Sequence, residues 1–264
     1  MIDGREDQAA GLRRLFRQTP PAVVAFYATG RYRAGNAVLA AHRIAAQRQR
    51  VLLLDEATGD EALADALGLA PGPDLLQMLD GRMTLAGLLQ PVVGLFGRVP
   101  AAAAALALPL LDDARRVCLV QALRVLHSHA GFVLIHAGCD SARDPSPFVL
   151  AAPQRLLVAE ASASGATDAY RTIKQLAAAG AGSLHVAVIR ARGIADARNF
   201  FISLQVLVRQ HVGIPLVWLG EVERDDLAAG LTRMPSASSA REAGASFLRR
   251  LADARPWREA GASG

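Results

Sequence analysis

Two glycines at the spacing of a phosphate-binding loop are the first residues whose pattern points to a chemistry. The segment Gly30-Arg-Tyr-Arg-Ala-Gly-Asn-Ala37 lies between a short apolar run and an amphipathic one. In the pattern G-x-x-x-x-G-K-[ST], backbone N–H groups cradle phosphates, the lysine reaches the β- and γ-phosphates and the hydroxyl binds Mg²⁺. Here Gly30 and Gly35 are in place, but Asn36 stands at the lysine position and Ala37 at the hydroxyl position. Taken alone, the segment favours an ordinary strand-to-helix turn over a phosphate site.

The overall composition offers no ready substitute for the missing lysine. All of the 29 basic residues except Lys174 are arginines, and the formal net charge is +5. Phosphoryl transfer takes most of its electrostatic support from a positioned cation and from Mg²⁺. The loop therefore favours, without deciding it, a protein that is not an enzyme and has no catalytic residues.

Two cysteines and six histidines provide little for a metal site or a covalent mechanism. Cys118 and Cys139 are too few for a disulfide framework or a four-cysteine zinc site. His127 and His129 stand two positions apart, so on a helix they point in different directions. His136 could be a metal ligand or a general base, but a strand-end histidine that fills a polar site is the favoured interpretation. The sequence therefore predicts no bound metal.

Apolar runs that alternate with amphipathic segments predict the architecture. An apolar run at 22–27, a glycine turn, an amphipathic segment at 37–49 and a second apolar run at 51–55 follow the order of a βαβ unit. Further strands are expected at 131–136, 155–159, 183–190 and 215–220, with helices at 62–69, 75–79, 85–89, 114–129, 166–179, 195–211, 227–231 and 240–254. This pattern predicts an α/β fold with a single doubly wound, mostly parallel sheet and helices on both faces.

No segment has the pattern of a signal peptide or of a membrane span. Residues 1–7 are charged and lack an apolar core, and the longest apolar run, Val99 to Leu111, is shorter than the roughly 20 residues that cross a bilayer. We expect a cytoplasmic protein. The basic charge is only a weak indication of acidic partners or of an anionic membrane surface.

Several stretches outside the loop resemble one group of nucleotide-binding proteins. Asp7-Gln-Ala-Ala-Gly-Leu-Arg13 resembles a DQAxxLR element, and Thr167-Asp-Ala-Tyr-Arg-Thr-Ile-Lys174 resembles a TDAYxxIK helix. Residues 50–59, 63–71 and 219–225 are similar to further segments of the same proteins. Over nearly its full length the chain thus resembles the MinD/ParA group of P-loop ATPases, most closely its flagellar-placement branch, the FlhG/FleN proteins. The resemblance implies a P-loop NTPase-like fold of the MinD type.

The resemblance also assigns nucleotide-binding roles, and this chain departs from the family at most of them. The cofactor-binding positions implied by the family loop GKGGVGKT and its first acidic strand end are Gly30, Arg31, Gly35, Asn36, Ala37 and Asp55. Arg31 keeps a cation where the family's signature lysine reaches across a dimer, and Arg31 and Arg33 could still attract an anion. The family's water-positioning acid, metal-site acid and adenine-reading asparagine are replaced by Ala57, His136 and Ile189 or Arg190. We therefore expect no cofactor, with ATP or ADP and Mg²⁺ bound only if the altered loop has another means of holding them.

The resemblance implies a regulator of flagellar number or placement that has lost ATPase activity and acts through protein contacts. In the family the N-terminal element stimulates an SRP-type GTPase, FlhF, and the matching contact residues here are Asp7, Gln8, Leu12, Arg13 and Phe16. Two alternatives stay open. One is a residual ATP-binding switch or slow ATPase, and the other is a non-catalytic subunit that pairs with an intact paralogue through Arg31.

Three parts of the chain are expected to differ in role. They are an N-terminal partner-activating peptide at 1–20, a MinD-like α/β domain at 21–235, and a C-terminal basic helix and tail at 236–264. MinD relatives often end in a membrane-binding helix, but packing of Phe247, Leu248 and Leu251 on the domain is slightly favoured here. The further partners implied are flagellar switch or regulatory proteins, a second copy or a paralogue, and a weak contact with the inner membrane or cell pole, but no nucleic acid.

Overall fold

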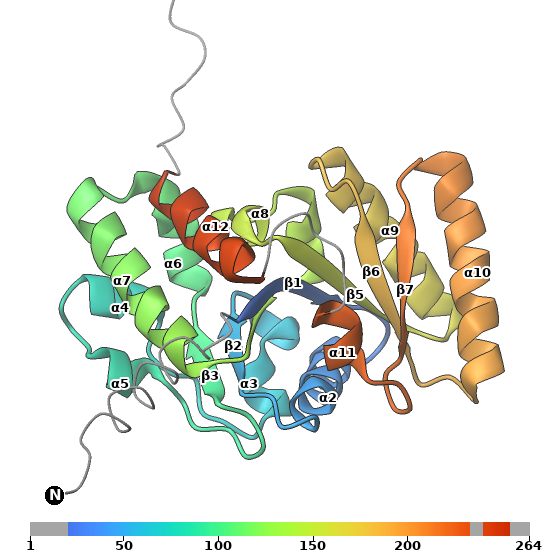
Figure 1. Ribbon diagram of the computed structural model, residues 1–264, viewed down its shortest axis with the longest axis horizontal. Coiled ribbons are helices and arrows are strands. Elements are labelled where there is room, and N and C mark those ends of the chain that lie inside the picture. Colours follow the sequence, from blue (N-terminus) through green and yellow to red (C-terminus); the bar gives the residue numbers. More distant parts are fainter. Residues whose placement is uncertain (1–20, 233–239, 254–264) are drawn as a thin grey trace, which may run out of the picture.

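The computed structural model describes residues 21–232 and 240–253 of the chain, and its centre is a seven-stranded parallel sheet (Figure 1). The strands are β1 (Ala22–Ala28), β2 (Val51–Asp55), β3 (Gly97–Pro100), β4 (Phe132–His136), β5 (Gln154–Glu160), β6 (Leu184–Ile189) and β7 (Leu216–Glu221). Their order in the sheet is β3-β2-β4-β1-β5-β6-β7, and every pair of neighbours is parallel. The predicted α/β fold with one doubly wound sheet is confirmed.

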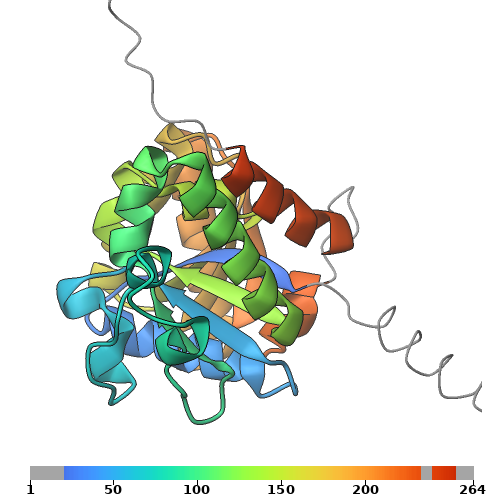
Figure 2. The ribbon, with the colours of Figure 1, turned by 90° about the vertical axis from the view of Figure 1, so that its left-hand side faces the viewer.

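Helices cover both faces of this sheet, and the strands accordingly carry runs of buried apolar residues, as in β1 and β4. The larger layer contains α4 (Leu75–Leu79), α5 (Leu85–Leu88), α6 (Ala102–Ala107), α7 (Asp113–His129), α8 (Pro147–Ala151), α9 (Ala163–Ala178), α10 (Ile194–His211) and α12 (Ala240–Ala252). The other layer contains α2 (Arg33–Ala45), α3 (Leu63–Ala66) and α11 (Leu227–Thr232). Figure 2 shows α7 and α12 on one side of the strands and α2 and α3 on the other. Short 3₁₀ turns η1 (Gly59–Glu61), η2 (Leu108–Leu110) and η3 (Cys139–Arg143) lie in the connections.

Strand β3 and helices α6 and α8 were not predicted from the sequence, and helix α2 begins earlier than predicted. Strand β3 was not expected, because it has only four residues. It leads directly into the alanine-rich segment 101–105, so no change of pattern marks its end. Helix α2 begins at Arg33 instead of at residue 37, because Arg33 and Ala34 are residue types that helices accept. This earlier start shortens the connection between β1 and α2.

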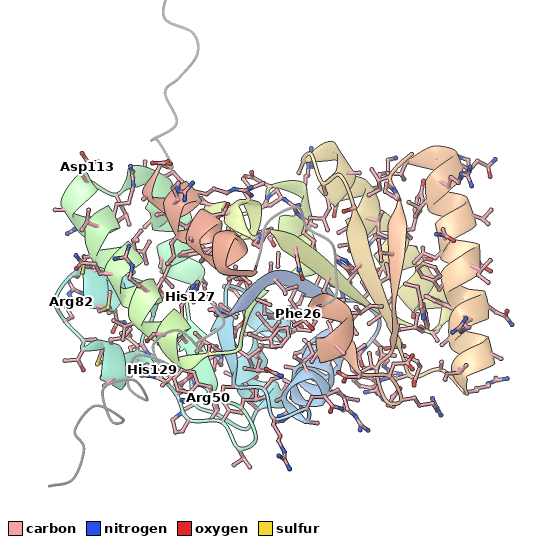
Figure 3. The ribbon with its side chains drawn as sticks, viewed as in Figure 1. Phe26, Arg50, Arg82, Asp113, His127 and His129 are labelled. Atoms are coloured by element: carbon pink, nitrogen blue, oxygen red, sulfur yellow. The ribbon has the colours of Figure 1, made fainter. Side chains whose placement is uncertain are left out.

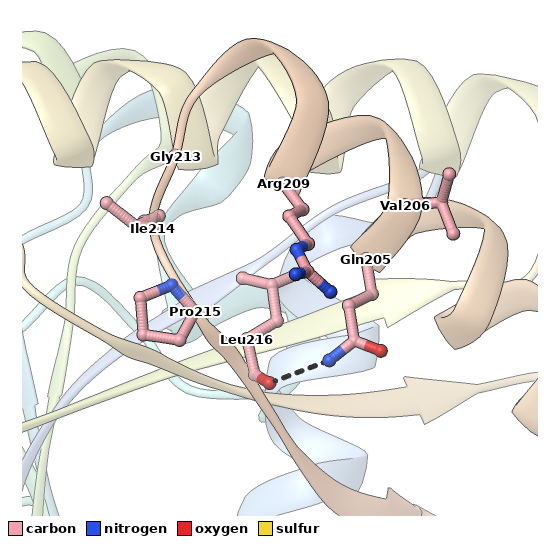
Figure 4. A pocket seen from close by; sticks show the side chains of 7 residues that line it. All are labelled: Gln205, Val206, Arg209, Gly213, Ile214, Pro215 and Leu216. Carbon is pink, nitrogen blue, oxygen red and sulfur yellow. Dashed lines mark hydrogen bonds between the residues drawn. The ribbon is translucent and has the colours of Figure 1, made fainter.

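The C-terminal helix α12 is part of the larger layer. Phe247 and Leu251 are fully buried, and Leu248 packs against the same core. The ring of His127, which Figure 3 labels on α7, stacks on Phe247 with 5.4 Å between ring centroids. The favoured interpretation of these residues, packing on the domain, is confirmed. In the described ranges, no helix has the length and apolar character that a membrane span requires.

Candidate functional site

The candidate site lies at the carboxyl edge of the sheet, where the ends of the parallel strands meet. Asp55 ends β2, His136 ends β4 and Glu160 ends β5. Strand register places His136 beside both Asp55 and Phe26, and places Glu160 beside Ile189. Ligands of open α/β sheets bind at this edge, so its side chains decide what the protein can hold.

The connection from β1 to α2 is a tight turn followed directly by helix. Tyr32 is the N-cap of α2, and the backbone N–H of Asn36 donates to the Tyr32 carbonyl oxygen at 2.7 Å. In a phosphate loop, successive N–H groups between the two glycines point at the bound anion. Here the segment from Arg33 to Asn36 is helical, so only the four residues from Thr29 to Tyr32 separate strand from helix.

Asn36 is fully buried, and its side-chain amide is saturated by hydrogen bonds. The amide nitrogen donates to the Thr29 carbonyl oxygen at 2.9 Å and to Glu160 Oε2 at 3.1 Å. The amide oxygen accepts from Arg190 Nε at 2.7 Å. Asn36 therefore joins α2 to the ends of β5 and β6, at the position where the loop pattern has its lysine.

Glu160 brings a carboxylate against the turn. It is almost completely buried, and its other oxygen accepts from Ser162 Oγ at 3.0 Å. Gly30 has φ of +97°, and a Cβ built there would come within 2.3 Å of Glu160 Oε2. Only glycine tolerates this backbone and this close approach. Gly30 is thus explained by contact with a carboxylate of the chain itself.

Arg33, at the start of α2, forms ion pairs with two acidic side chains from other parts of the chain. Its guanidinium forms ion pairs with Glu61 of η1 and, at 3.1 Å, with Asp168 of α9. Glu61 also accepts the backbone N–H of Cys139 at 2.6 Å. Burial opposes the charge on Arg33, but the hydrogen bonds to Glu61 and Asp168 outweigh it and raise the pKa of the guanidinium. Arg33 is therefore occupied within the chain.

Asp55 is the centre of a buried ionic cluster. Arg98 of β3 donates to Asp55 Oδ2 from Nε at 2.8 Å and lies 2.6 Å away through Nη2. His136 Nδ1 is 3.0 Å from Asp55 Oδ1, and the Leu63 N–H donates to Oδ2 at 3.0 Å. Burial would raise the pKa of Asp55, but His136, Arg98 and the Leu63 N–H outweigh it and lower the pKa. The favoured interpretation of His136, a strand-end histidine in a polar site, agrees with this contact.

Glu56, which sequence reasoning did not single out, does not replace the missing acid at Ala57. Ser146 Oγ donates to Glu56 Oε2 at 2.7 Å, and Ser146 is the N-cap of α8. Because α8 and α2 cover opposite faces of the sheet, this carboxyl group points away from the turn. Burial, with a smaller effect of Asp55, raises the pKa of Glu56 to about 8, although the Ser146 hydrogen bond acts in the opposite direction.

The residues present fit a triphosphate and its Mg²⁺ poorly. Glu160 places a carboxylate against Gly30 and Asn36, where phosphate oxygens would need donors. The partly buried Arg33 and the buried Arg98 are paired with Glu61, Asp168 and Asp55. Within the described residues, no three His, Cys, Asp or Glu side chains are grouped to hold a metal ion.

The structure brings together only some of the predicted site residues. Gly30, Asn36 and Asp55 are buried in the contacts above, Ala37 is packed in the core beneath α2, and Gly35 lies in the first turns of that helix. Arg31 is exposed. The predicted partner residues Asp7, Gln8, Leu12, Arg13 and Phe16 lie outside the described residues.

Comparisons with known proteins agree with the motif resemblance. No family model matches the chain. The antiactivator FleN of Pseudomonas aeruginosa is 27% identical over 179 residues, which are 67% of this chain and 64% of that protein. The match therefore spans slightly less than two thirds of the relative's length.

Two similar solved structures share 20% identity or less with this chain. The MinD cell division protein of Aquifex aeolicus has a TM-score of 0.48 at 20% identity, over 87% of this chain and 95% of that one. A ParA family ATPase of Chlorobium tepidum has a TM-score of 0.49 at 14% identity, over 89% of this chain and 98% of that one.

Proposed function

We propose that this chain, a MinD/ParA-type protein of the FlhG/FleN group, is a regulator that acts through protein contacts and not through ATP hydrolysis. The observation that carries the proposal is a hydrogen bond between Asn36 and the Glu160 carboxylate. Asn36 stands at the position of the phosphate-binding lysine in the loop pattern. An anion at this position meets a negative charge in a water-poor site, where electrostatic repulsion is strong.

Three features of the site support the proposal that the chain does not hydrolyse ATP. The early start of α2 removes inward-facing N–H groups, the Glu160–Asn36–Arg190 contacts fill the lysine position, and Arg98 and His136 surround the acid that would support a metal. A phosphate could enter only if the start of α2 unwound and these side chains moved. A residual ATP-binding switch, the alternative function, would require all three features to change when ATP binds.

The partner we propose is an SRP-type GTPase of the FlhF kind, with control of flagellar number or placement as the outcome. Support comes from the DQAxxLR-like element at Asp7–Arg13 and from the similarity to a protein described as an antiactivator. The element precedes Thr19-Pro-Pro21, which separates it from β1. An amphipathic segment attached in this way is suited to a groove on another protein.

A peptide of residues 1–20 is expected to raise the GTP hydrolysis rate of the cognate SRP-type GTPase several-fold. In the expected helix Gln8 and Leu12 are four residues apart and share a face, so Gln8→Ala should weaken the effect. Phosphate release measured with the peptide from one to 100 micromolar checks this. Arg17→Gln, a change outside the motif, serves as the matched control. A rate that stays unchanged at the highest concentration would contradict the proposed partner.

A second candidate function, pairing with an intact paralogue, is favoured by one observation. Arg31 is exposed while Arg33, two residues later, is fully engaged. An exposed guanidinium next to the start of α2 is free to approach a nucleotide held by another subunit. Mixing the chain with such a paralogue and measuring the mass of the complex with and without ATP separates this function from the first.

A further inference from the structure

Three side chains remain outward-facing above the closed turn, and we call them the Arg–Tyr–Arg cluster: Arg31, Tyr32 and Arg190. The Tyr32 side chain is 56% exposed. The guanidinium carbons of Arg31 and Arg190 each lie 5.5 Å from the centroid of its ring. In the described part of the chain, Arg50 over Phe96 and Arg198 over Trp218 are the other contacts of this kind, with one arginine each.

Arg190 is held in the cluster by its backbone and by a hydrogen bond. Its φ of +59° is in the left-handed region, which a non-glycine residue adopts only at an energetic cost. Its Nε donates to Asn36 Oδ1, so the guanidinium stays above the turn. The cluster is therefore organised before any partner arrives, which reduces the entropy lost on binding.

The carboxylates that contact Arg33 and Asn36 already have partners within the chain. Glu61 and Asp168 pair with Arg33, and Glu160 accepts from Asn36 and Ser162. The groups left to face solvent here are two guanidiniums and an aromatic ring. Tyrosine and arginine are the residue types that dominate binding energy at protein interfaces.

We propose that the Arg–Tyr–Arg cluster is a docking surface for an acidic segment of a protein partner. The proposal rests on the proposed function, since it adds a second contact to a regulator that works by binding. Charge complementarity identifies the occupant: carboxylates suit the two guanidiniums, and apolar side chains suit the ring face.

Two other occupants are disfavoured by the same charges. A second copy placed on a two-fold axis would bring the cluster against itself, and like charges would meet. A DNA backbone carries a phosphate charge about every 1.7 Å of helix axis and needs an extended row of cations. The cluster supplies two cations, Arg31 and Arg190, which lie over one ring and do not form such a row.

The test uses the full chain and a fluorescein-labelled peptide of eight glutamates, followed by anisotropy at low and at physiological salt. We expect binding at low salt that weakens about three- to tenfold with Arg31→Gln and with Tyr32→Ala. Both side chains are exposed, so neither change disturbs the core. Arg50→Gln is the matched control, because it removes an exposed arginine from another aromatic ring.

Each other outcome overturns the proposal. Equal weakening by Arg50→Gln would show a non-specific basic surface. Tighter binding of a duplex DNA probe with the same dependence on Tyr32 would identify nucleic acid as the occupant, and a concentration-dependent dimer lost with Tyr32→Ala would identify a second copy. Because the GTPase assay uses residues 1–20 alone, failure here and failure of the proposed function are distinguishable.

Discussion

Replacing Asp55 by asparagine is expected to lower the free energy of unfolding by about 3–5 kcal/mol, one of the largest effects available to a single substitution in this chain. Asp55 is 1% exposed and accepts hydrogen bonds from Arg98 and the Leu63 N–H, with His136 also in contact. The amide keeps the shape but loses the charge, so Arg98 is left buried without its partner. Urea denaturation followed by far-ultraviolet circular dichroism measures the loss.

Asp65→Asn is the matched control for Asp55. Asp65 lies in α3 on the same side of the sheet but is exposed, so its replacement should change stability by less than about 0.5 kcal/mol. A similar small change for Asp55→Asn would mean that the buried cluster does not stabilise the edge of the sheet. The structural explanation of His136 and Arg98 would then be wrong.

Replacing Glu56 by glutamine is expected to stabilise the protein at neutral and alkaline pH by roughly 2–4 kcal/mol. The pKa of Glu56 is raised from 4.5 to about 8 in the folded chain, chiefly by burial. Glutamine keeps an oxygen that accepts from Ser146 Oγ but carries no proton equilibrium. Thermal unfolding of both proteins across pH 4 to 9 checks the difference.

The sign of the Glu56 effect follows from proton binding. Below pH 4.5 both the folded and the unfolded chain hold the proton, so the two proteins should be equally stable in this respect. Between about 4.5 and 8 the unfolded chain releases its proton and the folded chain retains it, so the original protein loses stability as pH rises. A difference between the proteins that stays constant from pH 4 to 9 would contradict the raised pKa of Glu56.

The fold was predictable because its main signals are local. The apolar runs that became β1 and β2 are buried on both faces, as parallel strands require, and Gly30 marks the turn between strand and helix. Strand β3 escaped prediction because four residues are too few for periodicity to identify. With it, the sequence-based interpretation missed Arg98, the main cationic partner of Asp55.

The contents of the site were less predictable because they depend on contacts between distant residues. Asn36 meets Glu160 across 124 positions and Arg190 across 154. Comparison with the loop pattern showed that asparagine replaces the lysine at position 36. It could not show that the Glu160 carboxylate lies against that position. One signal was available: Glu160 ends β5 and Arg190 follows β6, and the carboxyl ends of parallel strands share one edge with the start of α2.

The same contacts explain why restoring the motif should not restore nucleotide binding. In the Asn36→Lys, Ala37→Thr variant, the new ammonium group would lie next to Glu160 and pair with it instead of with phosphate. The start of α2 at Arg33 and the ion pairs of Arg33 would be unchanged. A measurement of ATP binding should therefore include this variant, to test whether the two restored residues are enough for binding.

The absence of nucleotide binding is tested most directly by a calorimetric titration of the full chain with Mg·ATP, with ATP raised into the millimolar range. We expect heats equal to those of dilution, for the original protein and for the Asn36→Lys, Ala37→Thr variant alike, because the Glu160 carboxylate repels phosphate and Arg33 and Arg98 are already paired. A saturable, Mg²⁺-dependent heat with a Kd in the micromolar range for the original protein would contradict it.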